Sequence, residues 1–208
     1  MKKIIKSWMA VVVLVLPFVP VQANDTDDLL LSLYPKGGKS FFCKSKFTKI
    51  NSRIRSTPLY SLSYVRKELG CGTDSQCQSN SRYRLIAADL HNLYPMQASV
   101  NLKRRNAEFG NIAEPEVPAA IKRGCELYKS FQDLEPSDAL KGDVARVYLY
   151  MATTYEVPLK GEFKTMLEWH QLDPPDDGER DRNNRIEAIQ GTRNIFVDSP
   201  EQASALNL

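Results

Sequence analysis

Residues 87–110 read AADLHNLYPMQASVNLKRRNAEFG, and this stretch carries the densest set of chemically useful side chains in the chain. It places Asp89 and His91 shortly before Asn101 and a run of three cations, Lys103-Arg104-Arg105. Amide oxygens can ligate a hard cation such as Mg²⁺, and arginine binds phosphate through paired N–H groups. These residue types suit a site that binds or cleaves phosphodiesters, although a solvated polar segment can have the same composition.

The sequence around this stretch predicts an α+β fold with a helix-rich C-terminal half. Towards the C-terminus, apolar residues recur at helical spacing in three segments, which are residues 144–155, 163–169 and 185–189. Gly191 is a natural end for the last of them. Towards the N-terminus, partial alternation in residues 40–66 indicates strands joined by basic loops. A short helix is expected before them, at residues 29–34.

The N-terminus has the pattern of an export signal. Three lysines within residues 2–6 precede an apolar run at residues 9–16, and Val21-Gln22-Ala23 follows as a cleavage motif. The apolar run is far shorter than the roughly 20 residues that a membrane span needs. We expect residues 1–23 to be a signal peptide, with an uncleaved anchor as the alternative. Residues 24–208 should then form one exported domain, periplasmic or secreted, monomeric and not associated with a membrane.

Charge is distributed unevenly in the part that follows the expected signal. Residues 24–110 hold 14 basic and 7 acidic side chains, whereas residues 111–208 hold 11 basic and 18 acidic ones. A basic half is what a phosphate-binding face would need. Two solvated faces without a partner would give the same counts, so charge alone does not choose between these interpretations.

The cysteines predict two disulfides. An even number of cysteines in an exported chain indicates pairing, and four of them allow three connectivities. A zinc site is less favoured, because Cys71 and Cys77 are spaced too widely for a zinc knuckle and the chain has only two histidines. The four cysteines are Cys43, Cys71, Cys77 and Cys125.

Several blocks in a fixed order resemble the bacterial endonuclease I family, which comprises secreted or periplasmic nucleases that cut DNA and RNA with little sequence preference. Residues 88–106 are similar to its second signature, in which Asp-Leu-His-Asn-Leu, Pro, Val-Asn and Arg-x-Asn follow one another. Residues 141–151 resemble the family's long helix. Residues 168–170 and 182–197 are similar to its C-terminal block, so the resemblance covers most of the chain from Cys43 onward.

The resemblance implies a mixed α/β nuclease domain with a ββα-metal core. In that core a histidine activates water, while a glutamate and an asparagine hold one Mg²⁺ against the scissile phosphate. Asn101 matches the family's metal-binding asparagine. His91 and Asn92 match positions that family members carry in addition to the catalytic histidine, which makes His91 a structural residue or, alternatively, a substitute base.

The segment that supplies the family's base and carboxylate is not recognisable here. Family members carry Glu-His-Val-x-Pro upstream of the second signature, but residues 44–87 contain no histidine and a single glutamate, Glu68. The segment is therefore expected to be deleted. Ala87 stands where the family has a glutamate, and residues 72–76 replace a Gly-Gly-Arg loop. Loss of a general base typically costs roughly 10² to 10⁴ in rate.

Three functions are compatible with this pattern. The first is a weakened Mg²⁺-dependent, sequence-independent nuclease, with His91 as base and Asp89 or Glu68 as the ligand beside Asn101. The second is a module that binds DNA or RNA without cutting it, and the third is a protein-interaction module whose basic residues are merely solvated. The candidate nucleic-acid-binding residues are Arg66, Lys67, Lys103, Arg104, Arg105 and Asn106.

Overall fold

The computed structural model describes residues 23–105, 107–113 and 119–206. Residues 1–22 of the expected signal peptide and the candidate residue Asn106 lie outside these ranges. The described part is α+β with a helix-rich C-terminal half, as the sequence predicts. Within the same ranges, no helix combines the length and the apolar character that a membrane crossing requires.

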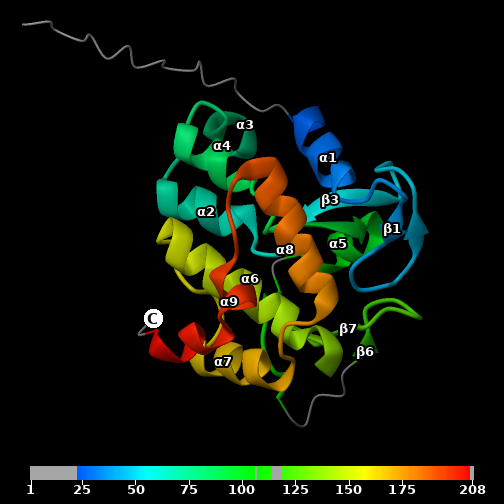
Figure 1. Cartoon of the computed structure of the whole chain (residues 1–208), viewed down its shortest axis with the longest axis vertical. Coiled ribbons are helices and arrows are strands. Elements are labelled where there is room, and N and C mark those ends of the chain that lie inside the picture. The colour runs from blue at the N-terminus through cyan, green and yellow to red at the C-terminus, as the bar shows by residue number, and fades with distance from the viewer. Residues whose placement is uncertain (1–22, 106, 114–118, 207–208) are drawn as a thin grey trace, which may run out of the picture.

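The N-terminal half alternates short helices with short strands (Figure 1). Helix α1 begins at Ala23, where signal cleavage is expected, and ends at Ser32, within the helix expected at residues 29–34. The elements are α1 (Ala23–Ser32), β1 (Gly38–Lys39), β2 (Lys46–Phe47), β3 (Ile54–Pro58), α2 (Leu62–Leu69), α3 (Asp74–Cys77), α4 (Ser81–Ala87), β4 (Leu93–Gln97) and α5 (Ala98–Arg104).

The C-terminal half starts with a small sheet and continues as helices. The three predicted helices are confirmed, and the last of them ends at Gly191, which has a left-handed φ of 73°. The elements are β5 (Glu108–Phe109), β6 (Ala119–Ala120), β7 (Leu127–Lys129), β8 (Asp133–Pro136), α6 (Asp138–Tyr155), α7 (Phe163–Leu172), α8 (Asp177–Gln190), α9 (Ile195–Asp198) and the 3₁₀ helix η1 (Pro200–Ala205).

Three small sheets carry the strands. Strands β1 and β2 pair with each other, and strands β5 to β8 form a four-stranded sheet in the order β5-β8-β7-β6. Strand β3 pairs antiparallel with β4, and α5 follows β4 directly, so β3, β4 and α5 form a strand–strand–helix unit. This unit is the ββα core that the sequence predicts.

The main core surrounds α6. This helix is buried along most of its length, and α7 packs beside it (Figure 1). A smaller apolar cluster joins α1 to β4 and α8 through Leu30, Leu93 and Ile186. Figure 1 shows α1 and the α2–α4 group at one end of the molecule, while α7 and α9 lie at the other.

Both predicted disulfides are present, and the structure selects one of the three connectivities. Cys43 pairs with Cys125 across 82 residues of sequence, which links the segment after β1 to the turn before β7. Cys71 pairs with Cys77 and closes a short loop between α2 and α3. No cysteine is left to ligate a metal.

Residues 62–69 form helix α2, so the prediction of strands throughout residues 40–66 is wrong at its end. The Ser61 side chain accepts a hydrogen bond from the Ser63 amide and thereby caps the helix. Val65 is fully buried on the inward face of the helix. Gly70 ends the helix with a left-handed φ of 58°, a conformation that favours glycine.

Candidate functional site

The strand–strand–helix unit places Asn101 on the protein surface. Ile54 of β3 lies opposite Gln97 of β4, and Gln97 is the residue from which α5 starts. Asn101 is exposed one turn further along α5. The structure thus contains a five-residue strand, residues 54–58, within the region where the sequence analysis expects a deletion.

Arg104 lies in the interior although the sequence places it in a basic cluster. Its side chain is 7% exposed, and its Nη2 donates a hydrogen bond of 2.8 Å to the Leu59 carbonyl. The guanidinium lies 5.2 Å from the centre of the Phe109 ring. Burial lowers the pKa of Arg104 from its usual range. Arg104 therefore ties α5 to the end of β3 and does not present its charge to solvent.

The neighbouring cations form an exposed basic face on α5. Lys103 and Arg105 are exposed, and the Nζ of Lys103 also donates a hydrogen bond to the Ile121 carbonyl. The Nζ of Lys129 donates to the Lys103 carbonyl at 2.8 Å, which adds another cation from strand β7. We call Lys103, Arg105 and Lys129 the α5 basic face. Of these residues, Lys103 lies on the same helix as Asn101, Arg105 follows the C-terminal end of that helix, and Lys129 belongs to β7.

The remaining basic candidates lie on α2 and are not equivalent. Lys67 is exposed. Arg66 is half-buried and forms an ion pair with Asp74. Its charge is therefore already compensated within the protein, whereas that of Lys67 faces solvent. Glu68, a candidate metal ligand, is also exposed on this helix.

Asp89 is the centre of a buried hydrogen-bond network. Its carboxylate accepts hydrogen bonds from the hydroxyl groups of Tyr150 at 2.8 Å and Tyr155 at 2.5 Å, both from α6. It also accepts from the Gln190 side-chain amide and from the backbone N–H of His91, each at 2.8 Å. The side chain is only 3% exposed. The carboxylate is thus fully engaged in joining the 89–91 segment to α6 and α8.

His91 is part of the same buried region. Its side chain is 4% exposed, its ring lies against that of Tyr150, and its Nε2 is 3.2 Å from the Thr192 carbonyl oxygen. Burial lowers the pKa of the imidazole below its ordinary value, so the ring is neutral at pH 7. The structure brings His91 and Asp89 together, but in the interior and away from solvent.

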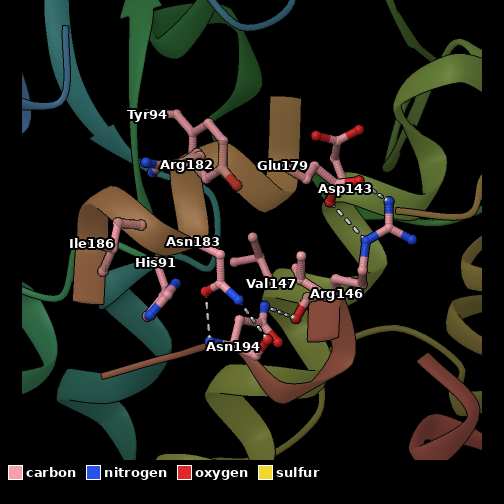
Figure 2. Close-up of a pocket in the computed structure, with 11 residues that line it drawn as sticks. His91, Tyr94, Asp143, Arg146, Val147, Glu179, Arg182, Asn183, Ile186 and Asn194 are labelled. Atoms are coloured by element: carbon pink, nitrogen blue, oxygen red, sulfur yellow. Dashed lines mark hydrogen bonds and ion pairs between the residues drawn. The ribbon is translucent and has the colours of Figure 1, made fainter. Parts of the chain in front are cut away.

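A second buried polar cluster lies beside His91, between α6 and α8 (Figure 2). Arg146 is 1% exposed and donates two hydrogen bonds to Glu179, at 2.7 and 2.6 Å, and one to the Asp173 carbonyl. Asp143 lines the same small cavity, and burial together with the Glu179 charge raises its pKa well above the usual range. Figure 2 shows these groups packed around one interior cavity.

An open groove of about 710 Å³ lies between α1, β3 and the α3–α4 segment. Two arginines line it, Arg55 from β3 and Arg84 from α4. Ala87, which stands where the family has a glutamate, lies in the same wall. Nothing in the sequence marks Arg84 as a candidate, because it occurs outside any recognised motif and its position depends on how α4 packs.

No metal-binding cluster is present in the part of the chain that the structure describes. Specifically, no group of three or more His, Cys, Asp or Glu side chains is placed to hold a metal ion. Asn101 and Asp89 belong to different surroundings, one exposed on α5 and the other buried against α6. The predicted site residues therefore divide into an exposed group on α5 and a buried group around Asp89.

The sequence model of the Endonuclease I family matches residues 32–201, which is most of the chain. The chain belongs to the Endonuclease I family. The match includes the strand–strand–helix unit, the α5 basic face and the buried networks of the C-terminal half. The α+β fold described above is thus the Endonuclease I fold as this chain forms it.

Similar proteins are nucleases by name. The extracellular ribonuclease of Bacillus subtilis is 36% identical over 137 residues, which cover 57% of this chain and 46% of that protein. The extracellular deoxyribonuclease of Aeromonas hydrophila is 29% identical over 131 residues, covering 61% and 56%. Endonuclease-1 of Buchnera aphidicola subsp. Acyrthosiphon pisum is 27% identical over 169 residues, covering 80% and 66%. The match spans about half the length of the first of these relatives.

Proposed function

We propose that this chain is a nucleic-acid-binding member of the Endonuclease I family in which Mg²⁺-dependent hydrolysis of DNA or RNA is weakened or lost. The observation that carries the proposal is the sequence of β3. This strand reads Ile54-Arg55-Ser56-Thr57-Pro58 and ends in proline, like the Glu-His-Val-x-Pro segment that supplies the family's ligand and base. If Pro58 corresponds to the proline of that segment, Ile54 stands in place of the glutamate and Arg55 in place of the histidine. The segment is then replaced, not deleted.

The two replacements remove the chemistry of the original pair. Ile54 has no oxygen to offer a cation, and its side chain is 6% exposed. Arg55 is exposed but carries a guanidinium that stays protonated at any physiological pH, so it cannot accept a proton from water. Asn101 remains as a single exposed amide, which is a poor Mg²⁺ site without a carboxylate partner. The residues present around Asn101 do not fit a magnesium site of the family's type.

Two of the three substitutes considered in the sequence, Asp89 and His91, are engaged elsewhere, and the third, Glu68, belongs to no group of three or more potential metal ligands among the described residues. The Asp89 carboxylate accepts four hydrogen bonds in the interior, and moving it to a surface metal would break all of them. His91 is buried beside it. We therefore assign both residues to the scaffold and leave hydrolysis without a base or an anionic ligand.

The binding half of the proposal rests on the α5 basic face. Lys103, on the helix that carries Asn101, and Arg105, at the end of that helix, are exposed cations, and exposed cations attract the phosphate backbone without regard to base sequence. The nuclease names of the relatives support nucleic acid as the ligand class. A protein-interaction module would need no such face.

Export is part of the same proposal. The extracellular and periplasmic names of the relatives support it, and two disulfides are consistent with an oxidising compartment. In this proposal residues 1–23 are the signal peptide, and the rest acts as a monomer outside the cytoplasm.

Retention and cleavage of DNA and RNA by the purified protein test the proposal. We expect both polymers to be retained on a native gel, with affinity falling steeply as salt rises. Cleavage with Mg²⁺ should stay close to the level seen with chelator, and Asn101→Ala should change neither result. Robust cleavage that disappears with chelator and with Asn101→Ala would contradict the loss of hydrolysis. Absence of retention at low salt would contradict the binding role.

A further inference from the structure

The groove between α1, β3 and α3–α4 has the features of a binding site for a small anion. Arg55 and Arg84 line it from two different elements. Arg84 is half-buried, and its Nη1 donates a hydrogen bond of 2.5 Å to the Gln78 carbonyl. Its Nε is buried and has no hydrogen-bond partner among the described residues. Because Arg84 lines the groove, an anion there could accept charge-assisted hydrogen bonds from its guanidinium.

The rest of the groove is largely apolar. Pro58, Leu62 and Leu93 line it together with Ala87 and Ala88. The groove volume of about 710 Å³ lies within the range of small-molecule sites. An apolar wall next to cations matches a ligand that has a flat, weakly polar part and an anionic part.

Two carboxylates also line the groove, and their partners determine its charge. Asp74 is ion-paired with Arg66 and accepts a hydrogen bond of 2.5 Å from the Tyr83 hydroxyl. Asp27 of α1 lies near the Ser56 backbone amide and near enough to Arg55 to interact with its charge. The charge of Asp74 is therefore neutralised by Arg66, whereas Asp27 competes with a bound anion for Arg55.

We propose that this groove binds one nucleotide unit, with its phosphate at Arg55 and Arg84 and its base against Pro58, Leu62 and Leu93. The inference rests on the proposed function in one respect, because nucleic acid is then the natural source of the nucleotide. The α5 basic face would hold the backbone of a strand, and the groove would hold a single nucleotide, either free or at a strand end.

Calorimetric titration of the full chain with 5′-AMP, inorganic phosphate and adenosine tests the groove. 5′-AMP should bind more tightly than either of its parts. Arg55→Gln and Arg84→Gln should each weaken 5′-AMP binding by about 10- to 100-fold, since each removes a charge-assisted hydrogen bond. Asp27→Asn should strengthen it by about two- to fivefold, because the competing charge is removed.

Arg53→Gln is the matched control. Arg53 is exposed, lies two residues before Arg55 and does not line the groove, so its loss removes the same charge without altering the site. An equal loss of affinity in Arg53→Gln, or no binding of 5′-AMP to the wild-type chain, would overturn the inference. Thermal unfolding of each variant separates a lost contact from a lost fold.

Short oligonucleotides distinguish the two sources of the nucleotide. If strand ends are the ligand, a 5′-phosphorylated trinucleotide should bind more tightly than its unphosphorylated form, and Arg84→Gln should remove the difference. If free nucleotides are the ligand, both trinucleotides should bind more weakly than 5′-AMP. Long polymers retained without any 5′-AMP binding would overturn the groove and leave the proposed function standing. Binding of 5′-AMP without retention of polymers would support the groove and contradict the proposed function.

Discussion

The buried networks around α6 and the strand–strand–helix unit differ in what their polar residues do. Around α6, Asp89 and Arg146 are nearly inaccessible, and their hydrogen bonds join segments far apart in sequence. On β3 and α5, Arg55 and Asn101 are exposed. Replacing Asp89 or Arg146 would leave buried donors or acceptors without partners, whereas replacing an exposed residue such as Arg55 or Asn101 costs the fold little.

Under the proposed function, this difference explains how a family sequence signature can persist while the chemistry of the site changes. Asp89 and His91, which lie in the stretch that resembles the family signature, support the interior, although both belong to residue types that catalyse reactions elsewhere. In the proposed correspondence, positions 54 and 55 differ from the family pattern, with Ile54 buried and Arg55 exposed.

The largest expected effect is on Arg146. Arg146→Met leaves Glu179 buried without its partner, so the free energy of unfolding should fall by about 3–5 kcal/mol. Urea unfolding of wild type and variant measures this loss of free energy. Arg180→Met is the control, because Arg180 is exposed and its ion pair with Asp177 is longer, and its loss should cost less than about 1 kcal/mol. Equal losses of unfolding free energy in the two variants would contradict the claim that the buried network around α6 supports the fold more than an exposed ion pair does.

The next effect separates two residues of the same signature. Asp89→Asn replaces a charged acceptor of four hydrogen bonds, and we expect unfolding to become easier by about 1.5–3 kcal/mol. Asn101→Ala, at an exposed position, should change stability by about 0.5 kcal/mol or less. Thermal unfolding of both variants checks this. An Asn101→Ala loss as large as that of Asp89→Asn would show that the exposed unit is also part of the scaffold.

A smaller effect depends on pH and concerns Asp143. Its folded-state pKa is raised by burial first and by the Glu179 charge second, while Arg146 partly opposes the shift. The folded chain thus holds this proton more tightly than the unfolded chain, and its contribution to stability is lost as pH rises through the folded pKa. Asp143→Asn should therefore be more stable than wild type at pH 8, by on the order of 1 kcal/mol, but not at pH 4. A urea midpoint for Asp143→Asn that exceeds the wild-type midpoint at pH 4 but not at pH 8 would contradict the buried environment assigned to Asp143.

The smallest effect on stability is expected at the α5 basic face. Arg105→Gln should leave the free energy of unfolding within about 0.5 kcal/mol of wild type. In binding, it should lower the slope of log affinity against log salt by about one, because one phosphate contact is lost. Arg180→Gln, an exposed change on α8, should leave the slope unchanged. An unchanged slope in Arg105→Gln would exclude this face from the interface.

The sequence predicts the helices and the family well because their signals are local and repeated. The apolar spacing in residues 144–155 and the glycine at position 191 each specify a helical feature without knowledge of the rest of the chain. The strand prediction fails at residues 62–66, since the cap at Ser61 and the left-handed Gly70 outweigh the partial alternation. The cysteine pairing needs the fold, because spacing leaves three connectivities open.

The candidate site was harder to predict because the local sequence does not show which side chains are buried in the fold. Lys103, Arg104 and Arg105 are neighbours in a basic run, yet only the middle one turns inward to the Leu59 carbonyl. Strand β3 lies where the sequence predicts strands, but local alternation does not show which strand it pairs with. Its pairing with β4 is a long-range property of the fold.

Restoration of the family pair on β3 tests the central claim most directly. The measurement is the rate of Mg²⁺-dependent cleavage of plasmid DNA by wild type and by the double variant Ile54→Glu/Arg55→His. Our account predicts that the double variant cleaves roughly 10² to 10⁴ times faster than wild type, and that chelator or an added Asn101→Ala abolishes the gain. A wild-type chain that already cleaves at the rate of the double variant, and loses this activity with chelator, would contradict it.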